Sequence, residues 1–385
     1  MKVLIIGAVP DRCETFVCRE MARAGVEMEV LCHAPADGRE LLREEKIPVG
    51  AIRFRGRVDP QAIRIIRRRL RSGAFDIVHA LNNRGLSNAL LASWGLPVRL
   101  IAYRGTIGHL SRWDPASWLT YLNPLIRRII CVSEAVRRYL LSLNVPASRL
   151  RTIYKGHDIA WYAGRASASF SEFGIPAGAL VVSFAGSMRP VKGVDVLLRA
   201  ARDLTDIPDL HILLLGEVRD RAIRRLAGEE RIRRFVHFAG HRKDAAALVG
   251  GSDIFVMPSL AREGLPKAVI EAMAQGVPAV VSDAGGLPEL VAAGESGLVV
   301  PAGDEKALAG AIRFLAGDRS RRQQIGQRGQ DRIRTHFDIR TTVERTMALY
   351  REVISPSTLT DHGRSHETRF GNGDGRRNPS TTPAS

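Results

Sequence analysis

Short apolar runs alternate with amphipathic segments along most of the chain. In the first half the apolar runs end at turn or polar residues, and segments with helical periodicity, such as 13–24 and 85–94, lie between them. Continuous apolar strands separated by helices are typical of a parallel sheet that is covered on both faces. The strand-like runs of this half are KVLII, MEVLC, FDIVH, VRLIAY and RIICVS.

The same alternation restarts after residue 165, beyond a break rich in Gly, Ala and Ser. The sequence therefore predicts two doubly wound, Rossmann-like α/β domains, over residues 1–163 and 164–338. In such sheets ligands bind beyond the carboxyl ends of the strands, so two facing sheets would form one cleft. A helix over 339–354 is expected to cross back, and the tail 355–385 has almost no apolar residues and is expected to be disordered.

The composition limits the classes of partner and compartment. The net charge of +17 leaves nucleic acid, anionic lipid and phosphorylated substrates open. The four cysteines form no Cys-x-x-Cys pair and no zinc-ligand spacing, which favours reduced thiols. No apolar run reaches the roughly 18 residues of a membrane span, and the N-terminal run is too short for a secretory signal. We expect a cytoplasmic protein that uses no metal and no cofactor.

The stretch FAGSMRPVKGVDVLLRA predicts an anion site. A strand ends at Ala185, a loop from Gly186 to Gly193 carries Arg189 and Lys192, and a helix follows. A loop with two cations before a helix N-terminus suits a phosphate, although solvated loop charges would look the same. The stretch matches neither a Walker loop nor the dinucleotide fingerprint.

The stretch SLAREGLPKAVIEAMAQG places Glu263 and Glu271 eight positions apart. Gly264, Leu265 and Pro266 are expected to begin a helix, because proline is tolerated in a first turn. Glu271 would then lie about two turns into the helix, so that both acids could face one side. Each acid alone is also explained by the helix dipole or by exposure on a helix.

These motifs in this order resemble the family-4 retaining glycosyltransferases of the GT-B fold (glycosyl transferases group 1). The resemblance rests on RPVKG, on the two glutamates with seven residues between them, on GGLPE and on GLVV, and it covers about residues 1–352. It implies that Arg189 and Lys192 neutralise the diphosphate of a nucleotide-sugar donor, while Glu263 contacts the donor-sugar hydroxyls and Glu271 the ribose. Gly186, Gly264 and Leu265 would complete the donor site.

Two positions depart from the family pattern. The family often has arginine directly after the glycine of the first loop, where this chain has Ser187. Many members have a histidine after the fifth N-terminal strand, where this chain has Arg104, with His109 five residues further on. Either Arg104 or His109 is expected to take the place of that histidine near the reacting centre.

The basic surface suggests where the acceptor comes from. The segment Ile63–Arg71 has apolar residues at helical spacing with arginines opposite them, as in helices that lie on anionic membranes. The same pattern also fits a helix packed on its own sheet. We expect a metal-independent hexosyltransferase acting on a lipopolysaccharide, glycolipid or polysaccharide acceptor of the cell envelope, peripheral on the inner face of the plasma membrane.

Two alternatives stay open. One is a sugar-nucleotide epimerase of the same fold. The other, suggested by charge alone, is a basic nucleic-acid-binding protein, which the absence of an RNA-recognition element or zinc-finger spacing disfavours. Nucleic acid is therefore not among the expected partners.

Overall fold

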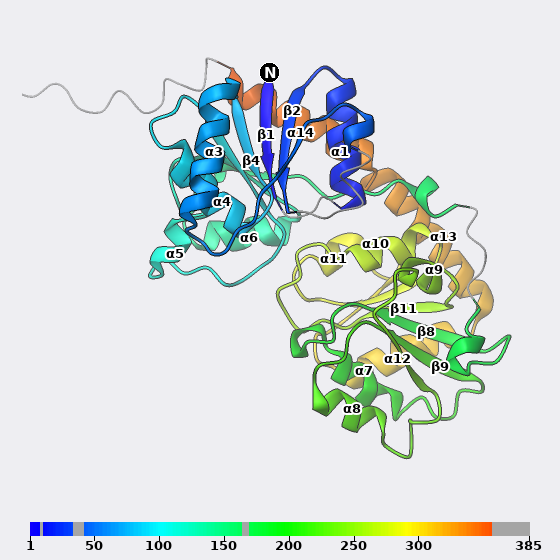
Figure 1. The fold of residues 1–385 in the computed structure, drawn as a ribbon. Helices are drawn as coiled ribbons and strands as arrows, with labels where there is room; N and C mark the ends of the chain where they lie inside the picture. Colours follow the sequence, from blue (N-terminus) through cyan, green and yellow to red (C-terminus); the bar gives the residue numbers. More distant parts are fainter. Residues whose placement is uncertain (8–10, 34–41, 164–168, 356–385) are drawn as a thin grey trace, which may run out of the picture.

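The computed structural model describes residues 1–7, 11–33, 42–163 and 169–355. It contains two parallel sheets, each with helices packed around it (Figure 1). This confirms the predicted class of two doubly wound α/β units. The expected boundary between residues 163 and 164 adjoins segment 164–168, which lies outside the described residues, as does the expected tail from 356 onward.

The first sheet has seven strands in the order β3-β2-β1-β4-β5-β6-β7, and the paired strands run parallel. We call this sheet, its helices and the returning helix α14 (Ile339–Ile354) the N-terminal domain. Its strands are β1 (Lys2–Ile6), β2 (Glu27–Cys32), β3 (Val49–Ala51), β4 (Ile77–Ala80), β5 (Arg99–Arg104), β6 (Ile126–Cys131) and β7 (Leu150–Thr152). Its helices include α1 (Arg12–Arg23), α3 (Pro60–Gly73), α4 (Asn83–Ser93), α5 (Pro115–Trp118) and α6 (Glu134–Ser142).

The second sheet has six strands in the order β10-β9-β8-β11-β12-β13 and belongs to the C-terminal domain. Its strands are β8 (Leu180–Ala185), β9 (Leu210–Leu215), β10 (Val236–Gly240), β11 (Ile254–Met257), β12 (Ala279–Ser282) and β13 (Leu298–Val300). Its helices are α7 (Val194–Ala201), α8 (Arg221–Ala227), α9 (Ala245–Gly250), α10 (Lys267–Ala274), α11 (Leu287–Leu290), α12 (Glu305–Ala316) and α13 (Arg319–His336).

The unbroken apolar runs follow from burial on both faces of each sheet. In β1, Val3 and Ile5 belong to the core that includes α1 and α14 residues, whereas Leu4 and Ile6 belong to the core under α3 and α4. Successive side chains of a strand point to opposite faces, so a strand between two helical layers must be apolar throughout.

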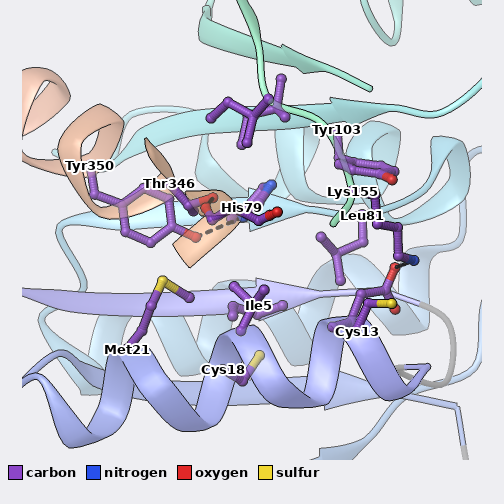
Figure 2. A pocket seen from close by; sticks show the side chains of 15 residues that line it. Ile5, Cys13, Cys18, Met21, His79, Leu81, Tyr103, Lys155, Thr346 and Tyr350 are labelled. Atoms are coloured by element: carbon purple, nitrogen blue, oxygen red, sulfur yellow. Dashed lines mark hydrogen bonds and ion pairs between the residues drawn. The ribbon is translucent and has the colours of Figure 1, made fainter. Parts of the chain in front are cut away.

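The last helix, α14 (Ile339–Ile354), leaves the C-terminal domain and packs on the first sheet beside α1 (Figure 1). Its buried Tyr350 hydroxyl lies 2.7 Å from Nδ1 of His79 on β4. Between α1, the sheet and α14 there is a cavity of about 60 Å³, into which these two side chains point (Figure 2). Burial lowers the pKa of His79 to about 4, so the imidazole is neutral at physiological pH.

Helix α3 is amphipathic as expected, but its apolar side is not available to a membrane. Ile66 and Leu70 are buried in the core beneath the helix, and Ile63 packs against the same core. The second interpretation of segment 63–71, a helix packed on its own sheet, is therefore correct. Within the described residues, no helix has the length and apolarity needed to cross a bilayer.

Candidate active site

The loop between β8 and α7 brings Lys192 to the carboxyl edge of the second sheet. Pro190–Lys192 form a single 3-10 turn, and Gly193 follows with a φ of +68°. A Cβ at Gly193 would come within 3.0 Å of the Pro258 carbonyl oxygen at the end of β11. The glycine therefore allows the turn to lie against the end of β11.

Lys192 meets Glu263 at this edge. The ammonium Nζ lies 2.6 Å from Oε1 of Glu263, and the side chains are 16% and 9% exposed. The Ser259 hydroxyl donates to the same carboxylate oxygen at 2.6 Å, and the Ser282 hydroxyl in turn donates to the Ser259 carbonyl oxygen. Residues from the ends of three neighbouring strands, β8, β11 and β12, thus hold one buried carboxylate.

The loop that carries Glu263 is pressed between two other loops. A Cβ at Gly264 would come within 3.0 Å of the Gly105 carbonyl oxygen, just beyond β5 of the N-terminal domain. A Cβ at Gly286 would meet the Gly264 carbonyl oxygen equally closely, and one at Gly285 would meet that of Glu263. The amide of Gly286 also donates to the Glu263 carbonyl oxygen at 3.1 Å. Next to the Lys192–Glu263 pair, the two domains therefore contact each other through closely packed backbone at glycine residues.

Arg104 and His109 end up in different environments. Arg104, the last residue of β5, is 2% exposed and lies next to Gly105. His109 is exposed at the surface, and its Nε2 is 3.2 Å from the Arg262 guanidinium across the domain boundary. Arg104 thus occupies the buried position beside the contact between the two loops, whereas His109 lies at its rim.

The start of α10 differs from the expectation. The helix begins at Lys267 after Pro266 with φ −71° and ψ 120°, so Gly264 and Leu265 precede it. Glu271 lies little more than one turn into the helix, not two, and pairs with Lys267 at 3.2 Å. The turn count from Glu263 was therefore wrong, because residue 263 is not helical.

The remaining predicted residues occupy the edge of the site. Arg189 is exposed, and its Nε donates to the Ser187 hydroxyl at 3.2 Å, whereas Lys192 is paired with the buried Glu263. Gly186 directly follows β8, with its amide bonded to the Leu215 carbonyl oxygen. Leu265 packs against apolar side chains of both domains.

Glu289, the last residue of the motif GGLPE, makes a contact between the domains that the sequence did not reveal. Its carboxylate accepts from the backbone amides of Glu134 and Ala135 at 2.8 and 2.7 Å, at the start of α6. The Tyr154 hydroxyl donates to it at 3.0 Å. Burial and the neighbouring Glu289 carboxylate raise the pKa of Tyr154 to about 12, which keeps that donor protonated. A carboxylate of one domain therefore caps a helix of the other.

Ser259 and Ser282 were also missed as members of the site. Ser282 is the last residue of β12 and Ser259 comes two residues after β11, so polar residues at the carboxyl ends of buried strands were the available signal. The sequence could not show that Ser259 supports Glu263, because that contact depends on how the loop folds.

Two parallel α/β sheets that meet at their carboxyl edges, with the last helix returned to the first sheet, define the GT-B class of fold. Two family models match the chain: one described as Glycosyl transferases group 1, over residues 167–332, and one described as Glycosyltransferase Family 4, over residues 15–161. The chain belongs to the family-4 glycosyltransferases of the GT-B fold, which confirms the resemblance drawn from its motifs.

Individual relatives agree with this assignment. The D-inositol 3-phosphate glycosyltransferase of Corynebacterium glutamicum is 31% identical over 247 residues, which are 60% of this chain and 59% of that protein. The chain spans about half the length of the first curated relatives it matches.

Solved structures share the fold. Anabaena HepE in complex with UDP-glucose has a TM-score of 0.76 at 22% identity and covers 91% of this chain and 100% of its own. The lipopolysaccharide outer core galactosyltransferase WaaB, in its apo form, has a TM-score of 0.68 at 15% identity over 91% and 100% of the two chains.

The glycine contacts generate a prediction. Gly264→Ala places a methyl group against the Gly105 carbonyl oxygen, so the two loops must move apart. We expect a destabilisation of about 1–3 kcal/mol from overpacking, seen as a lower melting temperature. Gly310→Ala is the matched control, because nothing lies within 4 Å of its added Cβ in α12 and alanine favours a helix. Equal melting temperatures for both variants would contradict the close contact.

Proposed function

We propose that the chain is a retaining hexosyltransferase that moves a sugar from a nucleotide-sugar donor to a saccharide acceptor of the cell envelope. The observation that carries the proposal is the buried Lys192–Glu263 pair, which lies at the carboxyl edge of the second sheet and beside the N-terminal domain. Retention follows from the family resemblance.

The donor fits the chemistry of this pair. Lys192 uses one ammonium proton on Glu263 and has two more for a diphosphate. In a site shielded from water, a cation at the departing diphosphate stabilises the charge that develops as the anomeric carbon–oxygen bond breaks. Oε2 of Glu263 takes neither of the two bonds described above, so it is the oxygen we assign to the donor-sugar hydroxyls. The UDP-glucose bound to HepE supports a nucleotide-sugar donor.

Arg189, Glu271, Gly186, Gly264 and Leu265 are assigned to the rest of the donor. Arg189 would reach the diphosphate from the surface. Glu271, which pairs with Lys267, would accept hydrogen bonds from the ribose hydroxyls. We assign the backbone amides of the loop at 264–265 to the phosphates, because this loop lies at the same carboxyl edge just before α10.

A cell-envelope acceptor is supported by the name of WaaB and by the charge of +17. An epimerase would isomerise the donor and transfer nothing. A nucleic-acid-binding protein would show steep salt dependence and no response to UDP. Product analysis with and without a saccharide acceptor separates these three.

The site predicts distinct effects for its two acids. Glu263→Gln keeps the shape but removes the charge, and we expect turnover to fall roughly ten- to a hundredfold while free UDP, which has no sugar, binds almost unchanged. Lys192→Ala should lower both turnover and the affinity for free UDP by at least tenfold, about 1.4 kcal/mol, because the proposed partner of this lysine is the diphosphate. Glu271→Ala should weaken the binding of free UDP, because the proposed partner of this acid is the ribose.

Calorimetric titration with UDP and a transfer assay measure these effects, with Glu230→Gln, an exposed acid on the surface, as the control. Loss of UDP affinity in Glu263→Gln equal to that in Glu271→Ala would reverse our assignment of the two ends. A fully active, folded Lys192→Ala variant would remove the lysine from the site.

We also expect transfer to proceed without a metal ion, because Lys192 can take the part of a metal at the leaving diphosphate. The assay is repeated in excess EDTA, with the rate expected to stay within twofold. A rate that is abolished by EDTA and restored by manganese or magnesium would refute this expectation.

Peripheral contact with an anionic membrane is proposed through the segment 112–125 in place of the apolar side of α3. Trp113 is 93% exposed, Leu125 is 63% and Trp118 is 46%, with Arg112 also exposed among them. Indole rings suit the boundary between water and lipid, and each basic residue near such a surface adds about 1 kcal/mol.

The membrane contact is tested by sedimentation with vesicles that contain anionic lipid. Trp113→Ala combined with Leu125→Ala should reduce the bound fraction severalfold. Replacing Arg64, Arg68 and Arg71 of α3 by glutamine tests the charge contribution alone. Unchanged sedimentation of the tryptophan–leucine variant would exclude the segment, and equal binding to neutral vesicles would exclude the charge attraction.

A further inference from the structure

A hollow of about 600 Å³ opens at the carboxyl edge of the first sheet, on the N-terminal side of the loop contact. Its volume falls within the range of pockets for small ligands. Its described lining contains cations, amides and hydroxyls but no carboxylate. The polar lining residues that bear on a ligand are His33, Asn82, Asn83, Arg84, Arg104 and Tyr121.

Arg104 is the buried member of this set. Its guanidinium lies 4.7 Å from the centre of the Tyr121 ring and donates through Nη2 to the Gly108 carbonyl oxygen. Tyr121 is itself fixed by hydrogen bonds of its hydroxyl to Asn83 and to the Tyr103 carbonyl oxygen, at 2.8 and 2.9 Å. The cation is therefore held in one orientation at the wall of the hollow.

The charge of Arg104 has no acidic partner within the described part of the chain. No carboxylate there lies within 4.0 Å of the guanidinium, and its buried Nε has no hydrogen-bond partner. By contrast, the buried Lys192 is paired with Glu263. A charge taken out of water without a partner costs several kcal/mol, so buried charges in proteins are normally paired.

The surroundings favour an anion at this place. Asn82 caps α4, whose N-terminal end contributes Asn83 and Arg84 to the same hollow. A helix N-terminus carries a partial positive charge, which adds to that of the two arginines. A planar guanidinium can donate two parallel hydrogen bonds to two oxygens of a phosphate or a carboxylate.

We propose that the acceptor carries an anionic group, a phosphate or a carboxylate, and that Arg104 binds it in this hollow with Arg84 at the rim. The proposal rests on the proposed function, because it names the class of acceptor for the same transfer. It makes Arg104 a residue of acceptor selection, in the place where the family commonly has a histidine.

The test uses wild-type protein saturated with UDP, so that added phosphate cannot occupy the donor site. Calorimetric titrations compare inorganic phosphate, glucose 6-phosphate and glucuronate with glucose as the matched neutral probe. We expect the anionic sugars to bind at least tenfold more tightly than glucose, and Arg104→Gln to abolish that difference. Arg84→Gln should reduce it about threefold, and Arg64→Gln on α3 should leave it unchanged.

The variants also separate the proposal from its alternatives. Arg104→Lys, which keeps the charge, should retain part of the preference. If Arg104→Gln does not fold, as judged by its melting temperature, Arg104→Lys and Arg84→Gln decide the question. A preference for anions that none of these variants changes would overturn the proposal. So would no anion binding by a wild type that still binds UDP.

Two other results would distinguish a wrong role for Arg104 from a wrong proposed function. A tenfold loss of UDP affinity in folded Arg104→Gln, with phosphate binding intact, would place Arg104 in the donor site and overturn its acceptor role. A wild type that binds no UDP would instead contradict the proposed function itself, so the two failures can be told apart.

Discussion

The site depends on glycines at the place where the loops after β5, β11 and β12 pack against one another. Gly264 approaches Gly105, Gly286 approaches Gly264 and Gly285 approaches Glu263, in each case more closely than a Cβ would permit. This contact brings the loop of Glu263, whose carboxylate is almost fully buried, against the end of β5. With bulkier residues the domains would stand apart, and Glu263 and Lys192 would be more exposed to water, where such a pair contributes little.

Two further contacts hold the domains in this relation. Glu289 caps α6 across the boundary, and α14 carries the end of the chain back to the first sheet, where Tyr350 reaches His79. The cap relies on backbone amides and the returning helix on apolar packing. The two contacts therefore differ in kind: the cap is made by hydrogen bonds at the loop contact, and the packing of α14 lies away from it on the first sheet.

Much of the fold could be predicted from the sequence because each strand is buried on both faces and so is apolar throughout, as β1 shows. The positions of Lys192 and Glu263 at strand ends followed from the same pattern. Their direct pairing did not, because it depends on Gly193 and Gly264 allowing two loops to fold together. The start of α10 was misplaced because Pro266 suits both a first helical turn and the residue before one. The apolar side of α3 was ambiguous because a stripe at helical spacing fits a sheet as well as a membrane.

The net charge of +17 says less about chemistry than the burial of individual cations does. Exposed arginines such as Arg219 and Arg313 are paired with neighbouring acids, and surface pairs of this kind contribute about 0–1 kcal/mol. Lys192 and Arg104 are the two cations with little exposure that lie on opposite sides of the loop contact, at the carboxyl edges of the two sheets. Lys192 has a carboxylate partner, and a donor diphosphate bound there, as we propose, would share the ammonium group with Glu263. Arg104 has none among the described residues, and an anionic ligand there would meet a charge that is already oriented and free of competition.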